Sequence, residues 1–429
     1  MNELAGKHLL VVGTGGVKRR PVLEALRALG LRRVTCLHDR PNWAAPLVDE
    51  WIEADSVTWS PATLDLVRSR VRDLDGVLTY DDYSVVVAAQ LADALGHIGI
   101  SPETAKRAKN KPAMRSLCRE RGLPAPRFAQ LDPWSDDVAS ALARERISFP
   151  VVAKPSHGAG SVLVRRADDL GELERTLRAY REAIPNEAAA ALWPDTTVLI
   201  EEYLAGAEVD IDMLVQGGEV KYAAVTDNFA PREPYFMELG GQIPSALPDR
   251  AQRELVRVAG EVLAALGVRD CCVHFEARWT ERGAVPIEAN LRLGGAEVYA
   301  FNRGAHGVDL VEGAVRIALG LPVARHDSSI PPRHFLRSAN LVPPCSGRLD
   351  SVTVEPGLAR DDGFAELVLF REVGSELRVP PEGFDYLGWL VVKGESRAAA
   401  DAKMRALAPK IRFEIGTTSF HGAFLESVS

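Results

Sequence analysis

Apolar residues in the first hundred positions form short strand-like runs that alternate with segments of helical spacing. Strands are predicted over residues 8–13, 33–37 and 76–80, and amphipathic helices over residues 21–29, 61–74 and 84–95. Strands and helices that alternate at this spacing build an open parallel α/β sheet. We therefore predict an α/β domain over residues 1–100, followed by a linking helix over residues 101–122 that begins with a Ser-Pro-Glu capping sequence.

The pattern changes after residue 122, where several strands follow one another without intervening helices. Strands are predicted over residues 149–154, 161–165, 197–202, 209–215, 220–226, 386–393 and 411–415, with helices over residues 168–183, 250–266, 308–319 and 396–407. This arrangement is typical of an α+β fold. The predicted multidomain chain has a small subdomain over residues 123–205, a larger one over residues 206–330, and a strand-rich α+β extension over residues 331–429.

The hairpin predicted around Arg282 carries charged and amide side chains on one face. Residues two apart in a strand share a face, so Glu288, Asn290 and Arg292 project together. If the turn is centred near Arg282, Glu276 lies opposite Glu288, about 5 Å away at Cβ. Two carboxylates and an amide oxygen suit Mg²⁺ or Mn²⁺. The alternative is a charged sheet face that is simply solvated.

A second group of residues has the chemistry to hold a nucleotide. Lys154 ends a predicted strand and precedes a loop of small residues, 156–161, whose backbone N–H groups suit an anion. The loop is not a Walker A motif, because neither Lys-Ser/Thr nor a helix follows it. Glu201 and Glu208, at the exit of another strand, suit an adenine amino group and ribose hydroxyls. The loop could instead be an ordinary glycine-rich hairpin, and the two glutamates could be surface acids. Lys111, in a predicted helix, is a further candidate, with a solvated helix lysine as the alternative.

Composition restricts the function further. The chain has 429 residues, 46% of them hydrophobic, which suffices for two or three packed units. The net charge is −8 and no basic block stands out, which argues against nucleic-acid binding. Five cysteines without a CxxC pair indicate reduced thiols. With no signal-peptide pattern and no apolar run of membrane-spanning length, we expect a cytoplasmic protein without membrane contact.

The order of the candidate residues along the chain resembles a known family. Lys111, Lys154 with its glycine loop, Glu201, Glu208, Glu276 and Glu288-x-Asn290-x-Arg292 follow one another as in the ATP-grasp superfamily of carboxylate–amine ligases. Residues 227–248 and 307–310 are similar to its amino-acid ligase branch, which includes L-amino acid ligases and carnosine synthase. The resemblance implies a pre-ATP-grasp N-terminal domain, a small lid subdomain over residues 123–205 and a large subdomain over residues 206–330.

The resemblance also implies a role for each motif residue. Lys111 and Lys154 would hold the ATP phosphates under a loop that contains His157, Gly158, Gly160 and Ser161, and adenine and ribose would be bound by Glu201, the Tyr203 and Leu204 backbone, and Glu208. Mg²⁺ or Mn²⁺ would be bound by Glu276, Glu288 and Asn290. Arg292 and Lys154 would act in catalysis, and the substrate would be contacted by Glu238, Gly294 and Gly295. Many relatives carry Gly-His where this chain has Gly240-Gly241-Gln242, so the substrate amino acid stays open.

The implied activity is ATP-dependent ligation of an amino-acid carboxylate to an amine, such as a second amino acid, through an acylphosphate. The resemblance also leads us to expect a homodimer. A nearby alternative is an ATP-grasp carboxylase that acts through carboxyphosphate.

An NAD(P)-dependent oxidoreductase is the alternative from a different class. Gly13-Thr14-Gly15-Gly16 with Asp39 is a partial dinucleotide-binding fingerprint, although Lys18 replaces its third glycine. Among the remaining polar residues, we expect His274 and His306 to be structural or next to substrate, and Asp210 and Asp212 to be solvated.

Overall fold

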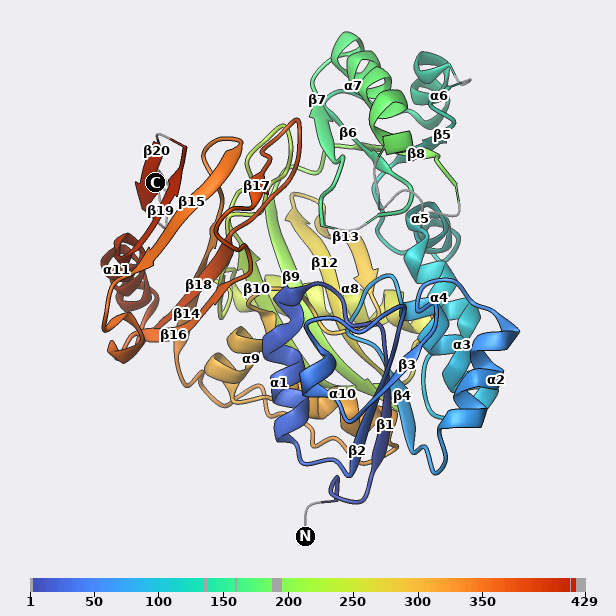
Figure 1. The fold of residues 1–429 in the computed structure, drawn as a ribbon. Helices are drawn as coiled ribbons and strands as arrows, with labels where there is room; N and C mark the ends of the chain where they lie inside the picture. The colour runs from blue at the N-terminus through green and yellow to red at the C-terminus, as the bar shows by residue number, and fades with distance from the viewer. Residues whose placement is uncertain (1–2, 135–136, 159, 187–194, 417, 422–429) are drawn as a thin grey trace.

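The N-terminal residues form a four-stranded parallel sheet in the order β3–β2–β1–β4 (Figure 1). The elements are β1 His8–Val12, α1 Arg20–Ala28, β2 Arg33–His38, β3 Glu50–Glu53, α2 Pro61–Arg70, β4 Gly76–Leu78 and α3 Val85–Leu95. The predicted α/β fold of this region is confirmed. The short strand β3 was not predicted, because Ile52 is its one fully buried residue and gives no alternation to detect.

The computed structural model describes residues 3–134, 137–158, 160–186, 195–416 and 418–421. The linking segment contains two helices, α4 Pro102–Lys109 and α5 Lys111–Glu120, so the prediction of one helix over residues 101–122 is wrong. Asn110 lies between them in an extended conformation, and its side chain accepts a hydrogen bond from Ala113 N. Pro112 has no N–H to continue α4 and sits instead in the first turn of α5. As a result, Lys111 is the first residue of a new helix.

The small sheet is antiparallel and has the order β5–β8–β6–β7. Its elements are β5 Phe128–Leu131, α6 Val138–Glu145, β6 Val151–Pro155, β7 Arg165–Ala167, α7 Leu170–Ala183 and β8 Val198–Glu202. The helices α6 and α7 lie together on one side of this sheet, where their apolar residues form one core with it (Figure 1). The strand predicted over residues 161–165 is wrong over most of its length. Ser161 and Leu163 have positive φ angles, which a strand does not accommodate.

The large sheet has eight strands in the order β13–β12–β9–β10–β11–β14–β18–β16. They are β9 Ala207–Gln216, β10 Glu219–Asn228, β11 Gly241–Ile243, β12 Cys271–Thr280, β13 Gly283–Asn290, β14 Phe335–Leu341, β16 Phe364–Leu369 and β18 Gly388–Gly394. Three of these strands come from the predicted C-terminal extension. That part of the chain therefore completes the sheet that carries the β12–β13 hairpin.

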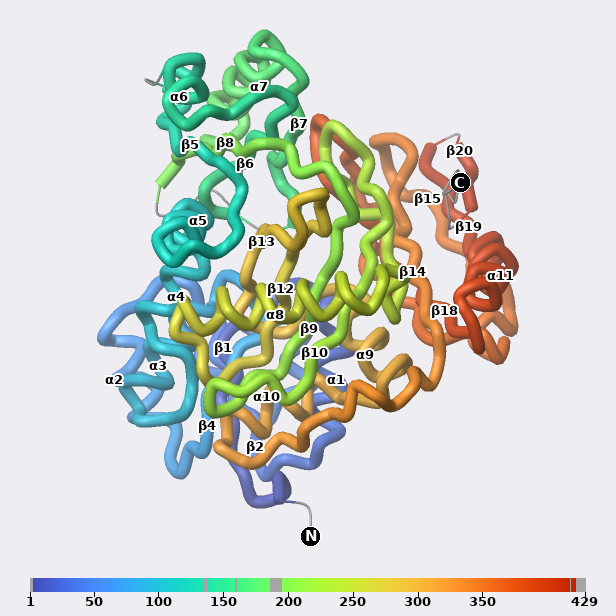
Figure 2. Tube along the Cα trace, turned by 180° about the vertical axis from the view of Figure 1, so that it is seen from behind, coloured from blue at the N-terminus to red at the C-terminus, as the bar shows by residue number. Residues whose placement is uncertain are grey.

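Helices cover the two faces of the large sheet differently. Helix α8 Asp249–Leu266 crosses the back of β9, β10, β12 and β13 and buries one face (Figure 2). Helices α9 Val298–His306 and α10 Leu310–Ala318 pack on the other face, in a core shared with the N-terminal domain. Helix α9 was not predicted. The shared core holds the loops that follow β1 and β4 close to the end of β13.

The remaining C-terminal residues form a small antiparallel sheet in the order β17–β15–β19–β20 beside helix α11 (Figure 1). The elements are β15 Gly347–Val354, β17 Glu376–Leu377, α11 Arg397–Leu407, β19 Ile411–Ile415 and β20 Thr418–His421. The predicted α/β and α+β multidomain fold is thus confirmed, whereas the exact domain boundaries stay predictions. Across the part of the chain that the structure describes, every helix is too short or too polar to cross a membrane.

Candidate functional site

A polar cavity of about 130 Å³ lies between the small sheet and the β12–β13 hairpin. Every residue that the sequence predicts to bind the nucleotide lines it. So do two of the predicted metal ligands and one predicted substrate residue. The predicted residues in its wall are Lys111, Lys154, His157, Gly158, Gly160, Ser161, Glu201, Tyr203, Leu204, Glu208, Glu238, Glu276 and Glu288.

The hairpin places Glu276 directly opposite Glu288, as predicted, but by a different route. The turn is tighter than expected, since Thr280 pairs with Gly283 across a two-residue loop. In an unbroken ladder from that turn, Glu276 would face Ile287. A β-bulge at Ile287 takes up one extra residue and brings Glu288 into register.

The two carboxylates form an acid-rich end of the cavity. Burial and the neighbouring Glu288 carboxylate raise the pKa of Glu276 to about 7. Burial also raises the pKa of Glu288, but the charges of Lys111 and Lys109 outweigh this effect and hold the pKa below its usual value. The Asn290 amide nitrogen donates a hydrogen bond of 3.1 Å to Glu276. The acid-rich end therefore has more negative than positive charge around Glu276.

These residues fit a Mg²⁺ ion that also binds ATP phosphates. Within the described ranges, no group of three or more His, Cys, Asp or Glu side chains is arranged as a closed metal site. Mg²⁺ is usually held by one or two carboxylates, with phosphates and waters as the other ligands. Two opposed, mutually repelling carboxylates in the wall of a cavity that also contains Lys111 and Lys154 are consistent with that donor set.

Lys111 connects the acid-rich end to the glycine loop. Its ammonium group lies 3.1 Å from the Glu288 carboxylate and donates a 2.9 Å hydrogen bond to the Gly158 carbonyl. His157 in the same loop lies 3.2 Å from Asp195. The break between α4 and α5 makes these contacts accessible, because Lys111 starts a helix at the cavity wall.

Lys154 and Glu201 form a buried ion pair at 2.5 Å, and Arg115 completes it from the other side. Arg115 donates to Glu201 at 2.7 Å and to the carbonyl of the bulge residue Ile287 at 2.5 Å. Burial opposes ionisation of Glu201, but Arg115 and Lys154 lower its pKa to about 2. Burial lowers the pKa of Lys154. Sequence analysis missed Arg115, because helix arginines are usually solvated.

Glu208 is also paired within the protein. Arg278 holds it through two guanidinium nitrogens, at 3.1 Å and 2.6 Å, and donates to the Leu204 carbonyl at 2.8 Å. Arg278 lies on the hairpin face that the alternation identified, but the sequence suggested no role for it. The Glu208 carboxylate is thus fixed beside the Tyr203–Leu204 backbone.

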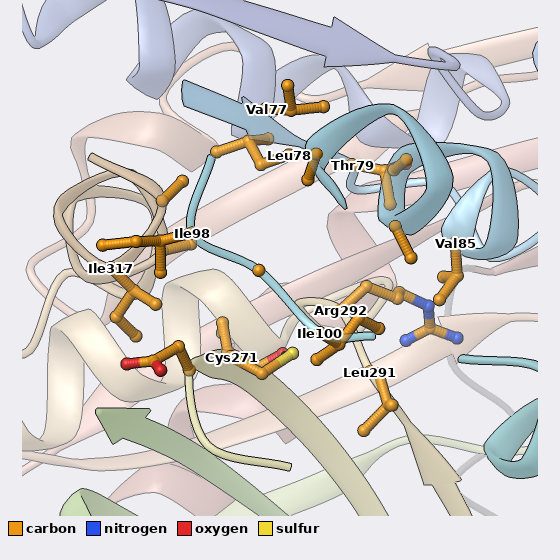
Figure 3. Close-up of a pocket in the computed structure, with 18 of the residues that line it drawn as sticks. Val77, Leu78, Thr79, Val85, Ile98, Ile100, Cys271, Leu291, Arg292 and Ile317 are labelled. Atoms are coloured by element: carbon orange, nitrogen blue, oxygen red, sulfur yellow. The ribbon is translucent and has the colours of Figure 1, made fainter. Parts of the chain in front are cut away.

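Arg292 and Asn290 do not line the polar cavity. The Arg292 stem borders a separate apolar cavity of about 70 Å³, between Leu78, Ile98 and Ile317 (Figure 3). Its Nε lies 3.3 Å from Asp82, which also pairs with Lys109.

The N-terminal domain therefore holds the residues that follow β13. Asp82 follows β4, and although burial opposes its ionisation, Lys109 and Arg292 hold its pKa well below the usual range. Arg19, in the loop after β1, is buried and donates to the carbonyls of Leu293 and Gly294. Sequence analysis missed both residues. Their signal is their place at the carboxyl ends of parallel strands, where α/β sheets bind ligands.

The predicted substrate residues lie around the acid-rich end. Burial and the nearby Asp210 and Glu208 carboxylates raise the pKa of Glu238 to about 7. Its backbone N–H donates at 2.9 Å to the Tyr386 hydroxyl, so the C-terminal region supports this loop. A Cβ at Gly294 would lie 2.8 Å from His274 Nδ1, whereas one at Gly295 would meet nothing within 4 Å.

The prediction that Asp210 and Asp212 are solvated is wrong, since the Asp210 side chain is only 14% exposed and that of Asp212 is buried. This carboxylate is 1% exposed and accepts hydrogen bonds from His274 at 2.8 Å and Asn302 at 3.1 Å. The strand alternation on β9 was right, but helix α9, which was not predicted, covers that face. Burial lowers the pKa of His274, but Asp210 and Asp212 outweigh it and raise the value to about 9.

Two protein-family models match parts of this chain. A family model for the ATP-grasp domain matches residues 147–299, and one for the L-amino acid ligase C-terminal domain 2 matches residues 340–416. The chain therefore contains an ATP-grasp domain over residues 147–299. The first match contains the glycine loop, Glu201 and the whole metal hairpin of this ATP-grasp protein. The predicted family is confirmed.

The ATP-grasp protein is similar to carnosine synthase 1 of Gallus gallus, with 32% identity over 343 residues, and of Homo sapiens, with 30% identity over 332 residues. The matches cover 74% of this chain in both cases. The chain spans 36% and 40% of the length of these relatives. Its fold is similar to the crystal structure of L-amino acid ligase from Bacillus licheniformis, with a TM-score of 0.84, 22% identity, and coverage of 96% of this chain and 100% of that chain.

Proposed function

We propose that this ATP-grasp protein is an ATP-dependent ligase that joins the carboxylate of an amino acid to an amine, such as a second amino acid. The observation that carries the proposal is the bulged hairpin. It sets Glu276 against Glu288 at the edge of a cavity whose other walls carry Lys111 and Lys154. Acids for a cation and lysines for phosphates thus meet in one place.

The proposed reaction has two steps. A carboxylate oxygen of the first substrate attacks the γ-phosphorus of ATP, the bond to the β-phosphate oxygen breaks, and ADP leaves. The amine nitrogen of the second substrate then attacks the acyl carbon, and phosphate leaves while the nitrogen loses a proton. Neither step needs a nucleophilic side chain from the protein. Phosphoryl transfer depends mainly on positioning and on stabilising negative charge.

Each group of residues has a part in this reaction. Lys111 and Lys154 neutralise phosphate oxygens, and Glu208 and the Tyr203–Leu204 backbone orient the nucleoside. Glu276, Glu288 and Asn290 would hold Mg²⁺, which would stabilise negative charge on the transferred phosphoryl group. We assign to Arg292, which Asp82 holds outside the wall of the polar cavity, the role of stabilising the acylphosphate. Water must be kept out because an acylphosphate hydrolyses, and the glycine loop and residues 227–248 are the proposed lid.

A phosphate-release assay with Mg-ATP tests the proposal. Pairs of amino acids are screened, and one pair is expected to stimulate release well above either amino acid alone. Hydroxylamine should trap the acylphosphate of the first substrate as a hydroxamate. Stimulation by bicarbonate without any stimulating pair would instead support the carboxylase alternative. Stabilisation by NAD(P)H but not by Mg-ATP in a thermal-shift assay would overturn both readings.

A further inference from the structure

His274 lies beside the acid-rich end, within 4 Å of three carboxylates. It lies on β12, cross-strand from Asp212 on β9, while Glu276 is cross-strand from Asp210. The ring Nδ1 is 2.8 Å from Asp212, and Nε2 is 3.9 Å from both Asp210 and Glu276. The imidazole thus stands between the proposed metal ligand Glu276 and a second acid on the neighbouring strand.

A chain of buried hydrogen bonds fixes the ring from behind. Asn302 on α9 donates to the second oxygen of Asp212 at 3.1 Å, and its own carbonyl accepts from the Tyr222 hydroxyl at 2.6 Å. Asp212, Asn302 and Tyr222 are each at most 2% exposed. The orientation of His274 is therefore set by β10 and α9, far from solvent.

Close packing limits the ring on another side. A Cβ on Gly294 would come within 2.8 Å of His274 Nδ1, so the glycine after the metal strand lies against the imidazole. The ring is held by Asp212, by Gly294 and by the two strands. Such a ring has little freedom to turn away from Glu276.

We propose that His274 is a positioning residue that holds the Glu276 carboxylate toward the metal and keeps it apart from Asp210. Opposed like charges on adjacent strands repel each other, and a ring nitrogen placed between them opposes that repulsion. Partners behind a metal ligand commonly determine its orientation and affinity. The inference rests on the metal assignment of the proposed function, but not on which substrates are joined.

Metal affinity measures this role without any ligase assay. Binding of Mn²⁺ to the full chain is followed by electron paramagnetic resonance in the presence of a non-hydrolysable ATP analogue. His274→Gln is expected to weaken Mn²⁺ binding by roughly 10- to 100-fold, with an unchanged circular dichroism spectrum. Asp212→Asn should weaken it to a similar degree. Because both residues act through one ring, the double variant should bind little worse than either single variant.

Two further variants complete the experiment. Tyr222→Phe removes only the last hydroxyl of the chain and should cost about 2- to 3-fold, within the range of one hydrogen bond. His334→Asn is the matched control, a partly buried histidine before β14 whose ring pairs with Glu395, and should leave Mn²⁺ affinity unchanged. If His274→Gln does not fold, Asp212→Asn and Tyr222→Phe decide the question.

Three results would overturn the proposal. The first is an Mn²⁺ affinity within 2-fold of that of the unmodified protein in every folded variant of His274, Asp212 and Tyr222. The second is a double variant in which the effects of His274→Gln and Asp212→Asn multiply. The third is that the unmodified protein does not bind Mn²⁺. A protein that binds Mn²⁺ as expected but ligates no amino-acid pair would contradict the proposed function and leave this inference standing.

Discussion

The two ends of the polar cavity treat charge in opposite ways. At the nucleotide end, Glu201 is matched by Lys154 and Arg115, and its pKa falls to about 2. At the acid-rich end, Glu276 and Glu238 have pKa values raised to about 7, because burial and neighbouring acids act together. At the first end two cations surround one carboxylate, whereas the second end retains unbalanced negative charge.

Residues at the nucleotide end therefore stabilise the cavity, whereas residues at the acid-rich end are stabilised by a bound ligand. Because Arg115 and Lys154 already pair with Glu201, these side chains keep their positions whether or not a nucleotide is present. Opposed carboxylates lower their energy only by taking up protons or a cation. Changes at the nucleotide end should therefore affect stability first, and changes at the acid-rich end should affect metal binding and turnover first.

The largest effect is expected at the acid-rich end. Glu288→Gln removes one of the two opposed carboxylates and should lower the rate of ATP-dependent ligation by roughly 100-fold or more. Phosphate release with the stimulating amino-acid pair measures the loss, and circular dichroism checks the fold. Glu281→Gln, an exposed change in the turn of the same hairpin, is the control. Normal turnover in Glu288→Gln would refute the metal assignment.

The nucleotide end should show the converse result. Glu201→Gln leaves Arg115 and Lys154 buried without their counter-charge and should lower the free energy of unfolding by about 3 kcal/mol. Urea denaturation provides the measurement. Glu202→Gln is the matched control on the same strand, because its partners Arg127 and Arg282 are 51% and 55% exposed. Equal losses in the two variants would contradict the contrast between the ends.

A smaller effect is expected where the N-terminal domain meets the metal strand. Asp82→Asn removes the carboxylate beside Arg292 and should lower kcat about 10-fold, with KM for ATP nearly unchanged. Steady-state kinetics at saturating amino acids separates the two constants. Asp93→Asn, an exposed change on α3 of the same domain, serves as control. A change in KM alone would indicate that Asp82 acts on nucleotide binding instead.

The last effect expected is a dependence of stability on pH. Folding raises the pKa of Asp210 to about 8 and those of Glu238 and Glu276 to about 7, so the folded state binds protons that the unfolded state releases. His274, raised to about 9, acts in the same direction. Stability without metal should therefore fall as the pH rises from about 4.5 to 9, by about 1.4 kcal/mol per pH unit for each group that lies between its unfolded and its folded pKa.

Urea titrations in a metal chelator at several pH values would measure this slope. Glu238→Gln should make the slope shallower, while Glu201, with its pKa of about 2, titrates outside the window. A stability that rises with pH over this range would show that the acids at this end are not the unbalanced group described above.

The sequence predicted the acid-rich end more directly than the nucleotide end. Period-two alternation placed Glu276, Glu288 and Asn290 on one face, and the structure confirms the pairing of the two glutamates. Arg115 could not be found in this way, because a helix gives no sign of which arginine meets a strand 86 residues further along the chain. Local periodicity identifies residues that share an element, but not partners that meet only after folding.

Local periodicity also predicted some parts of the fold and missed others. The alternation of strands and helices predicted the parallel N-terminal sheet, and its family resemblance predicted the ATP-grasp region. No local pattern indicated that β14, β16 and β18 would extend the large sheet beyond β11. The break at Asn110 did have a local cause, since Pro112 cannot donate the hydrogen bond that would continue α4.

The bulge at Ile287 has a consequence for comparing or exchanging parts of such chains. Across a two-residue turn, directly paired positions have residue numbers that add to an odd total, as Thr280 and Gly283 do. Glu276 and Glu288 add to an even total, so they face each other only because one residue is skipped. A graft that straightens the strand would turn Glu288 and Asn290 into the core, even though every motif residue was retained.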